Sequence, residues 1–346
     1  MFRRRGEKAG NTGTVARPEP PVQPLLEEID SLQSRLDRSS DAQALRELRD
    51  LRHRAGIGLL ESPPALRDYP TPSGSLPDPA PGAIPELSPG EISPGFLRAA
   101  ILRDGCAIVR GLVPEDRARA LAEDLDHIFR RRASDLSGSE SGEGEDLLYE
   151  EFVPQPPYVL IERPWVYQAG GIWLSDSPRM MAEVFHLYER VGLRQLVSDF
   201  LGGRPVLSVN KSTLRRAHAS YSRIDWHQDG AFMGDVRTLN VWLSLSDCGD
   251  RAPGLVMVPR RIDRIVQTGT PGARFDWSVS PVVAEDEAGS AGIIHPVFAP
   301  GDAVLFDNFF LHATWVHDGM PDPRYALESW FFNPAAFPSE YVPLAF

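Results

Sequence analysis

Short strand-forming segments fill the second half of the chain and limit what it can fold into. They are rich in β-branched and aromatic residues, are divided by Pro, Gly and Asp turns, and span residues 157–162, 205–214, 237–247, 254–259, 303–315 and 325–332. One helical segment, residues 178–200, interrupts them. Because strands and helices do not alternate regularly, the pattern predicts a mainly β fold with flanking helices, in which antiparallel strands form a barrel or sandwich. The chain has neither a Rossmann glycine fingerprint nor a phosphate-binding loop, which argues against nucleotide-dependent classes.

The first quarter of the chain has a different composition. We predict a disordered basic N-terminus over residues 1–24, and a helical extension over residues 25–58, where leucines recur at helical spacing. A Pro-rich linker over residues 59–93 precludes regular helices and ladders. The catalytic domain is expected over residues 94–346, with an acidic mobile loop at residues 134–146.

Charge and hydrophobicity restrict the partners of the protein. The net charge of −12 disfavours nucleic acid, and no run of eighteen apolar residues exists to span a membrane. The basic start lacks the apolar stretch of a secretion signal, and two cysteines are too few for a disulfide framework, so we expect a cytoplasmic protein. The helical extension packs either on the main domain or on a second copy, which leaves a homo-oligomer open.

Three residues have the pattern of a metal site. His227 and Asp229 are two positions apart, and at a strand end this spacing points both side chains to one face. His312 ends a distant apolar strand that opens with Pro300-Gly301-Asp302. Two histidines and one carboxylate leave open coordination positions, an arrangement typical of non-haem iron(II) oxygenases. Zinc also accepts these ligands, so zinc hydrolysis is the competing use.

The residues after His312 favour iron over zinc. Arg324 lies twelve positions later (324 − 312 = 12) on the next predicted strand, and its guanidinium is a natural partner for a carboxylate. Thr314 adds a hydroxyl on the same face as His312. A basic stretch with Lys211, Arg215, Arg216 and Arg223 precedes the motif, either as a solvated face or as a site that attracts an anionic cosubstrate or substrate.

Taken together, these residues resemble the phytanoyl-CoA dioxygenase family of iron(II)- and 2-oxoglutarate-dependent oxygenases. The resemblance runs from about residue 94 to residue 332 and rests on Asn210-Lys211, His227-Gln228-Asp229, the strand 240–248, the turn at 252–254, residues 300–302, His312 and Arg324. It implies a double-stranded β-helix, a jelly roll of cupin-like form. It also implies that Arg324 and Thr314 bind the distal carboxylate of 2-oxoglutarate, in a pocket lined by Trp242 and Gln228.

The implied activity is hydroxylation of an unactivated C–H bond of a small-molecule substrate. Iron(II) would be the cofactor, with 2-oxoglutarate and dioxygen as cosubstrates and succinate and carbon dioxide as products. Halogenation is disfavoured because Asp229 occupies the place that related halogenases leave to halide. Two alternatives stay open: a metal-binding jelly roll without oxygenase activity, as a zinc hydrolase or sensor, and an adaptor that uses the N-terminal helices.

Overall fold

The computed structural model describes residues 22–36, 41–76, 83–137, 147–160, 163–220, 225–234 and 236–346. Its helices are α1 Val22–Leu36, α2 Ala42–Glu61, α3 Pro94–Asp104, α4 Glu115–Ser137, α5 Arg163–Gln168, α6 Pro178–Arg190, α7 Leu193–Leu201 and α8 Pro281–Ala288. Its strands are β1 Glu86–Leu87, β2 Cys106–Val109, β3 Gly171–Trp173, β4 Val206–Ser208, β5 Thr213–Ala217, β6 Thr238–Ser244, β7 Gly254–Met257, β8 Ala303–Phe306, β9 His312–Trp315, β10 Arg324–Phe332 and β11 Pro343–Ala345. Residues 1–21 and 138–146, which hold most of the predicted disordered N-terminus and acidic loop, lie outside the described residues.

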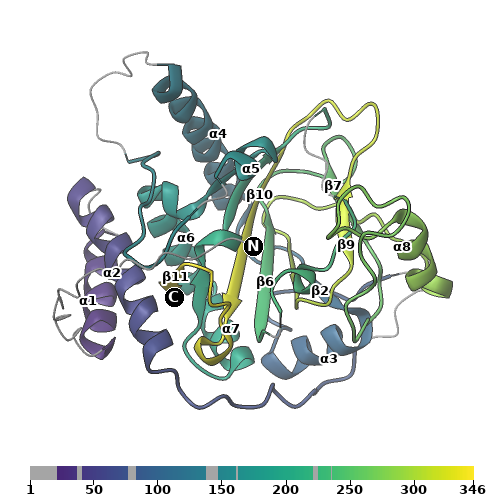
Figure 1. Ribbon diagram of the computed structural model, residues 1–346, viewed down its shortest axis with the longest axis horizontal. Coiled ribbons are helices and arrows are strands. Elements are labelled where there is room, and N and C mark those ends of the chain that lie inside the picture. The colour runs from purple at the N-terminus through teal and green to yellow at the C-terminus, as the bar shows by residue number, and fades with distance from the viewer. Residues whose placement is uncertain are drawn as a thin grey trace, which may run out of the picture.

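A large sheet forms the centre of the molecule (Figure 1). Its strand order is β1-β2-β8-β6-β10-β4-β11, and β5, which also pairs with β10, carries β3. The long strand β10 pairs antiparallel with β6, from Ala326 opposite Ser244 to Phe332 opposite Thr238. Since successive side chains point to opposite faces, β10 sends Leu327 and Phe331 to one side of the sheet and Ala326 and Trp330 to the other.

A second, smaller sheet faces the large one. Strands β7 and β9 pair antiparallel, and further bridges join His227 to His312, Cys248 to Phe298 and Met257 to Ile294. Apolar side chains from both sheets fill the space between them, which we call the inner core: Cys106, Ile108, Trp242, Leu255, Met257, Phe298, Val304, Phe306, Phe310, Ala326, Trp330 and Phe332. The large sheet is antiparallel except for the parallel pair β1 and β2, and the two facing sheets around one core confirm the predicted mainly β double-stranded β-helix with flanking helices.

Helices cover the opposite face of the large sheet. Their apolar sides and the sheet form the helix-side core, whose members include Leu97, Leu121, Phe185, Tyr188, Val197, Leu243, Leu305, Leu327 and Phe331. The single helix predicted over residues 178–200 is wrong, because α6 and α7 are separate helices. Gly192 lies between them at φ 74°, a left-handed conformation that glycine adopts without strain.

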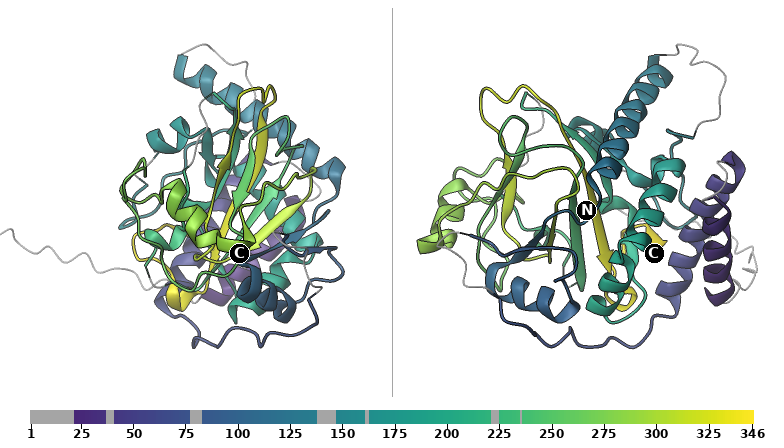
Figure 2. Two further views of the ribbon diagram at one scale, coloured as in Figure 1. Left: turned by 90° about the vertical axis from the view of Figure 1, so that its right-hand side faces the viewer. Right: turned by 180° about the vertical axis from the view of Figure 1, so that it is seen from behind.

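The N-terminal helices pack on the domain as an outer layer, beside α6 and the C-terminus (Figure 2). In α2, His53 is buried, with Nδ1 2.9 Å from the carbonyl oxygen of Pro343 in β11. Arg52 donates to the Ala345 carbonyl at 3.0 Å, and Arg49 pairs with Glu150 at 2.8 Å. The helical extension therefore has a partner within its own chain. No helix in the described ranges is both long and apolar enough to cross a membrane.

The strand predicted over residues 157–162 is wrong for its described part. Residues 157–160 form no strand, and residues 161 and 162 lie outside the described residues. Pro154, Pro156 and Pro157 fall in or next to this segment, and each lacks the backbone N–H that a sheet ladder needs.

Candidate metal centre

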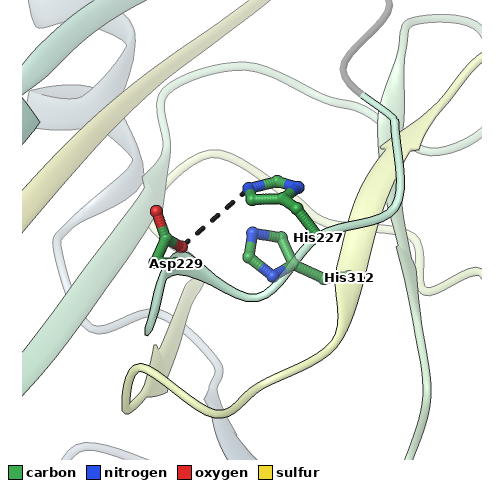
Figure 3. A group of neighbouring side chains, drawn as sticks. All are labelled: His227, Asp229 and His312. Carbon is green, nitrogen blue, oxygen red and sulfur yellow. Dashed lines mark ion pairs between the residues drawn. The ribbon is translucent and has the colours of Figure 1, made fainter. Parts of the chain in front are cut away.

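Backbone pairing between two distant segments places the predicted metal ligands together. His227 and His312 exchange backbone hydrogen bonds, with N to O distances of 3.0 and 3.1 Å. His312 is the first residue of β9, and Asp229 opens the short 3-10 turn Asp229–Ala231. The two-residue spacing from His227 to Asp229 then turns both side chains toward His312, as the sequence predicted (Figure 3).

The three side chains converge on one point. One ligand atom from each of His227, Asp229 and His312 lies within 4.8 Å of the others, and His227 Nε2 is 3.9 Å from Asp229 Oδ2. The Nδ1 atoms of the two histidines lie 2.8 Å from the Asp225 carbonyl oxygen and 3.1 Å from that of Phe310. Because a carbonyl only accepts, each Nδ1 carries the proton and each Nε2 keeps a lone pair. This orientation of imidazole by a backbone acceptor is common around metal sites.

Burial sets the charge of this cluster. Desolvation, helped by the neighbouring His312, lowers the pKa of His227 to about 4, so its imidazole is neutral near pH 7. A neutral imidazole is the form that binds a metal ion. Lys211 Nζ lies 3.6 Å from Asp229 Oδ1 and also 3.7 Å from the centroid of the Phe232 ring. The donor set of two imidazole nitrogens and one carboxylate fits iron(II), and zinc as well.

Arg324 begins β10 as a nearly fully buried cation. Its side chain points to the inner face, where Nη1 donates to the Gly254 carbonyl at 2.9 Å. Its buried Nε has no hydrogen-bond partner among the described residues. Desolvation lowers the pKa of Arg324 to about 10, which leaves the guanidinium charged at neutral pH. A buried charge with incomplete hydrogen bonding is costly unless a ligand completes it, so Arg324 fits an anion-binding role.

Two other predicted residues lie close to Arg324. The guanidinium carbon is 5.7 Å from the centroid of the Trp242 ring, and the buried Trp242 Nε1 also has no hydrogen-bond partner in the described structure. Thr314 in β9 pairs with Leu255, the residue after Gly254 whose carbonyl Arg324 reaches. The structure therefore brings Arg324, Trp242 and Thr314 together.

Gln228 lies elsewhere, and its expected place in the 2-oxoglutarate pocket needs correction. Its side-chain Nε2 donates to the carbonyl oxygens of Arg264 at 3.0 Å and Phe309 at 2.6 Å, and its Oε1 accepts from the Val266 N–H at 2.7 Å. The spacing that turns His227 and Asp229 toward the metal cluster turns the residue between them away from it. Gln228 instead holds the chain around residues 264–266 against the metal-bearing segment.

The basic residues before the motif are separated in the structure. Lys211 lies beside Asp229, while Arg216 pairs with Asp126 of α4 at 2.9 Å, on the side of the sheet that the helices cover. Arg223 lies outside the described residues. Arg215 is buried and binds both carboxylate oxygens of Glu328, at 2.7 and 2.9 Å. Glu328 is four residues from Arg324 on β10 and points to the same, inner face, so a carboxylate lies on that face. The sequence analysis did not assign Glu328, although the alternation of side chains along β5 and β10 could have predicted its pairing with Arg215.

A match to a protein family decides the classification. The model of the phytanoyl-CoA dioxygenase family matches residues 101–315, more than half of the chain and all three residues of the metal cluster. The chain belongs to this family. It is thereby one of the iron(II)- and 2-oxoglutarate-dependent oxygenases, as the sequence predicted. The matched range ends before Arg324, whose role therefore depends on its geometry.

Several solved structures are similar to this member of the phytanoyl-CoA dioxygenase family. EctD from S. alaskensis, crystallised with 2-oxoglutarate and 5-hydroxyectoine, is 18% identical, with 70% of this chain and 79% of that one covered and a TM-score of 0.43. The non-heme alpha-ketoglutarate-dependent carbocyclase SnoK from nogalamycin biosynthesis is 12% identical, with 72% and 87% covered and a TM-score of 0.47. EvdO2 from Micromonospora carbonacea var. aurantiaca, complexed with 2-oxoglutarate, is 15% identical, with 72% and 91% covered and a TM-score of 0.43. A search of curated proteins found no match.

Proposed function

We propose that this oxygenase hydroxylates an unactivated C–H bond of a small-molecule substrate, with iron(II) held by His227, Asp229 and His312. The observation that carries the proposal is the convergence of these three side chains in a fold whose inner face also holds a buried, incompletely bonded Arg324. When bound together, iron(II), 2-oxoglutarate and dioxygen supply the oxidation, with release of succinate and carbon dioxide.

The residues of the chain have distinct tasks in this proposal. His227 and His312 present Nε2 to the metal, and the carbonyl acceptors on Nδ1 fix each ring. Asp229 contributes the anionic oxygen. Arg324 binds the distal carboxylate of 2-oxoglutarate, for which its Nε, without a hydrogen-bond partner among the described residues, is a donor, and Trp242 lies beside its guanidinium.

Further contacts support this assignment. Thr314 offers a hydroxyl from the β9 side. Lys211 adds positive charge next to Asp229, which favours a dianionic cosubstrate.

Iron and 2-oxoglutarate binding test the proposal directly. Anaerobic protein should bind one iron(II) and then 2-oxoglutarate, and with air it should form succinate in the presence of iron(II) but not zinc(II). His312→Ala should lower iron affinity by more than ~100-fold, since even the outer partners of metal ligands contribute about 10- to 100-fold. His317→Ala is the matched control, because His317 is exposed and its Nδ1 lies 2.8 Å from the Asp318 carbonyl.

The outcomes separate this function from its rivals. Zinc-dependent hydrolysis without iron-dependent succinate would support the hydrolase. A wild-type protein that binds metal but forms no succinate and hydrolyses nothing would support the sensor, and one that binds neither iron nor 2-oxoglutarate would support the adaptor. Equal iron affinity in His312→Ala and His317→Ala would show that the ligand set is wrong.

A further inference from the structure

Aromatic side chains gather against the candidate metal ligand His227. The Phe232 ring stacks on the imidazole at a centroid distance of 6.4 Å and an interplanar angle of 18°. Trp277 meets the same imidazole edge-on, at 5.9 Å and 87°. Trp277 is perpendicular to Phe232 at 6.1 Å, and Phe275 stacks on Trp277 at 5.0 Å and 5°. We call Phe232, Phe275 and Trp277 the aromatic wall.

Two of the three rings of the aromatic wall are exposed although they are large and apolar, and Trp277 between them is half-buried. Phe232 is 38% exposed and Phe275 37%, and no other phenylalanine in the described part of the chain is as exposed. Ile265 is also 38% exposed. Its Cδ1 atom adjoins Gly230, two residues before Phe232 of the aromatic wall. Apolar surface gathered at one place, rather than scattered singly, is typical of a binding site.

Hydrogen bonds fix the segment that carries two of the rings. On one side of Phe275 and Trp277, the Val279 N–H donates to the Trp226 carbonyl at 2.7 Å. On the other side, Gln228 holds the chain through the Val266 N–H and the Arg264 carbonyl. Residues 226 and 228 alternate with the ligands His227 and Asp229. The same short segment therefore positions the metal cluster and the aromatic wall relative to each other.

Two cations hold the outer rings. Lys211 Nζ lies 3.7 Å from the centroid of the Phe232 ring, and the guanidinium carbon of Arg274 lies 5.2 Å from that of Phe275. Trp277 lies between these two rings, with one in stacked and the other in edge-on contact. The wall is thus held rigid, and it presents exposed aromatic surface of Phe232 and Phe275 rather than an adaptable aliphatic surface.

We propose that the aromatic wall binds an apolar ring system of the substrate and holds it beside the metal. This inference rests on the proposed oxygenase function and names the class of its substrate: small molecules with a flat unsaturated ring, rather than flexible acyl chains. Ring pairs in stacked or edge-to-face contact are stabilised beyond the burial of their area. A flexible chain would also lose rotational freedom at each bond along a rigid surface, whereas a ring does not.

Two neutral probes of similar size test this class. Binding of 2-naphthylmethanol and of nonan-1-ol is measured by calorimetry, with the metal-free protein and with the anaerobic iron(II) and 2-oxoglutarate complex. The wild type should bind the ring probe about tenfold more tightly than the chain probe, which is the size of one favourable aromatic pair at about 1.4 kcal/mol per decade. Trp277→Ala and Phe275→Ala should each weaken ring binding by roughly tenfold.

Matched variants make the result specific. Trp277→Phe keeps a ring and should retain most of the affinity, and Phe275→Ala tests the wall if Trp277→Ala does not fold. Leu66→Ala removes an apolar side chain that is 53% exposed on the N-terminal segment, and should change nothing. Equal binding of both probes by the wild type, or ring binding unaffected by both alanine variants, would overturn the aromatic wall. Failure of the wild type to bind iron and 2-oxoglutarate would overturn the proposed function instead. The affinity of the metal-free protein for 2-naphthylmethanol tests ring binding by the aromatic wall in either case.

Discussion

The two faces of the large sheet differ in what they bury. The face toward the helices is mostly apolar, with Leu327 and Phe331 of β10 packed against α6 and the C-terminal segment, and its buried Ser329 is paired with the Tyr188 hydroxyl at 3.0 Å. The inner face of the same strand carries Arg324 and Glu328 among aromatic residues. Buried atoms without a hydrogen-bond partner in the described structure lie on this inner face too, among them Arg324 Nε, Trp242 Nε1 and Asn240 Oδ1.

Within one sheet, the helix-side face mainly stabilises the fold, and the inner face carries the polar residues proposed to bind ligands. Apolar packing stabilises the fold in proportion to the area removed from water, and the helix-side core supplies it. Buried polar atoms without partners destabilise the free protein, so the unpartnered Arg324 Nε and Trp242 Nε1 on the inner face are best explained by a ligand that completes them. Substitutions on the helix side should therefore change mainly stability, and substitutions of the polar residues on the inner face should change mainly binding.

The largest expected effect on stability is that of Phe331→Ala. The Phe331 side chain is fully buried, and its ring lies 4.7 Å from that of Phe346 and 6.3 Å from that of Tyr188. Truncation should lower the free energy of unfolding by about 3–5 kcal/mol, measured by urea denaturation, with iron affinity of the folded protein unchanged. Arg324→Ala, on the opposite face of the same strand, should lower the free energy of unfolding by less than Phe331→Ala does, because the lost hydrogen bond to Gly254 is partly offset by removal of a buried charge. A larger loss for Arg324→Ala than for Phe331→Ala would remove the contrast between the faces.

A smaller loss is expected in the N-terminal layer. Leu48 of α2 is fully buried in a cluster that includes Ala182 of α6 and Val206 of β4. If this layer belongs to the same cooperative unit, Leu48→Ala should lower the single melting transition of the protein by the equivalent of about 2–5 kcal/mol. Circular dichroism at increasing temperature measures it. An early separate transition that leaves iron binding intact would indicate that residues 22–61 fold as an independent extension.

Local periodicity explains which features the sequence predicts. His227 and Asp229 could be placed on one face because a spacing of two fixes their direction, and the apolar strand that ends at His312 supplied the third residue. The same rule excludes Gln228 from that face, and the structure corrects the pocket role that the family resemblance implied. Helical spacing likewise predicts α1 and α2, but an amphipathic pattern says only that a face is buried, not which surface covers it.

Features made by irregular chain could not be predicted in this way. Phe275 and Trp277 lie in a long segment without regular periodicity, and Trp277, with Phe275 stacked on it, reaches His227 only because Gln228 and Trp226 hold that segment in place. The break between α6 and α7 depends on the left-handed backbone of one glycine, which a helical apolar pattern on both sides conceals. In both cases tertiary contacts or a single backbone conformation decide the structure.

The most direct test of the inner face is a calorimetric titration of 2-oxoglutarate into the anaerobic iron(II) protein. If Arg324 binds the distal carboxylate, Arg324→Ala should weaken 2-oxoglutarate binding by roughly 30- to several-thousand-fold, because losing one partner of a buried charge pair costs about 2–5 kcal/mol. The 2-oxoglutarate affinity of Arg324→Lys should lie between those of the wild type and Arg324→Ala, since lysine restores the charge but not the planar guanidinium. Arg251→Ala, with a side chain 70% exposed, is the control. Equal 2-oxoglutarate affinity in wild type and Arg324→Ala would contradict the account and leave Arg324 as a structural residue.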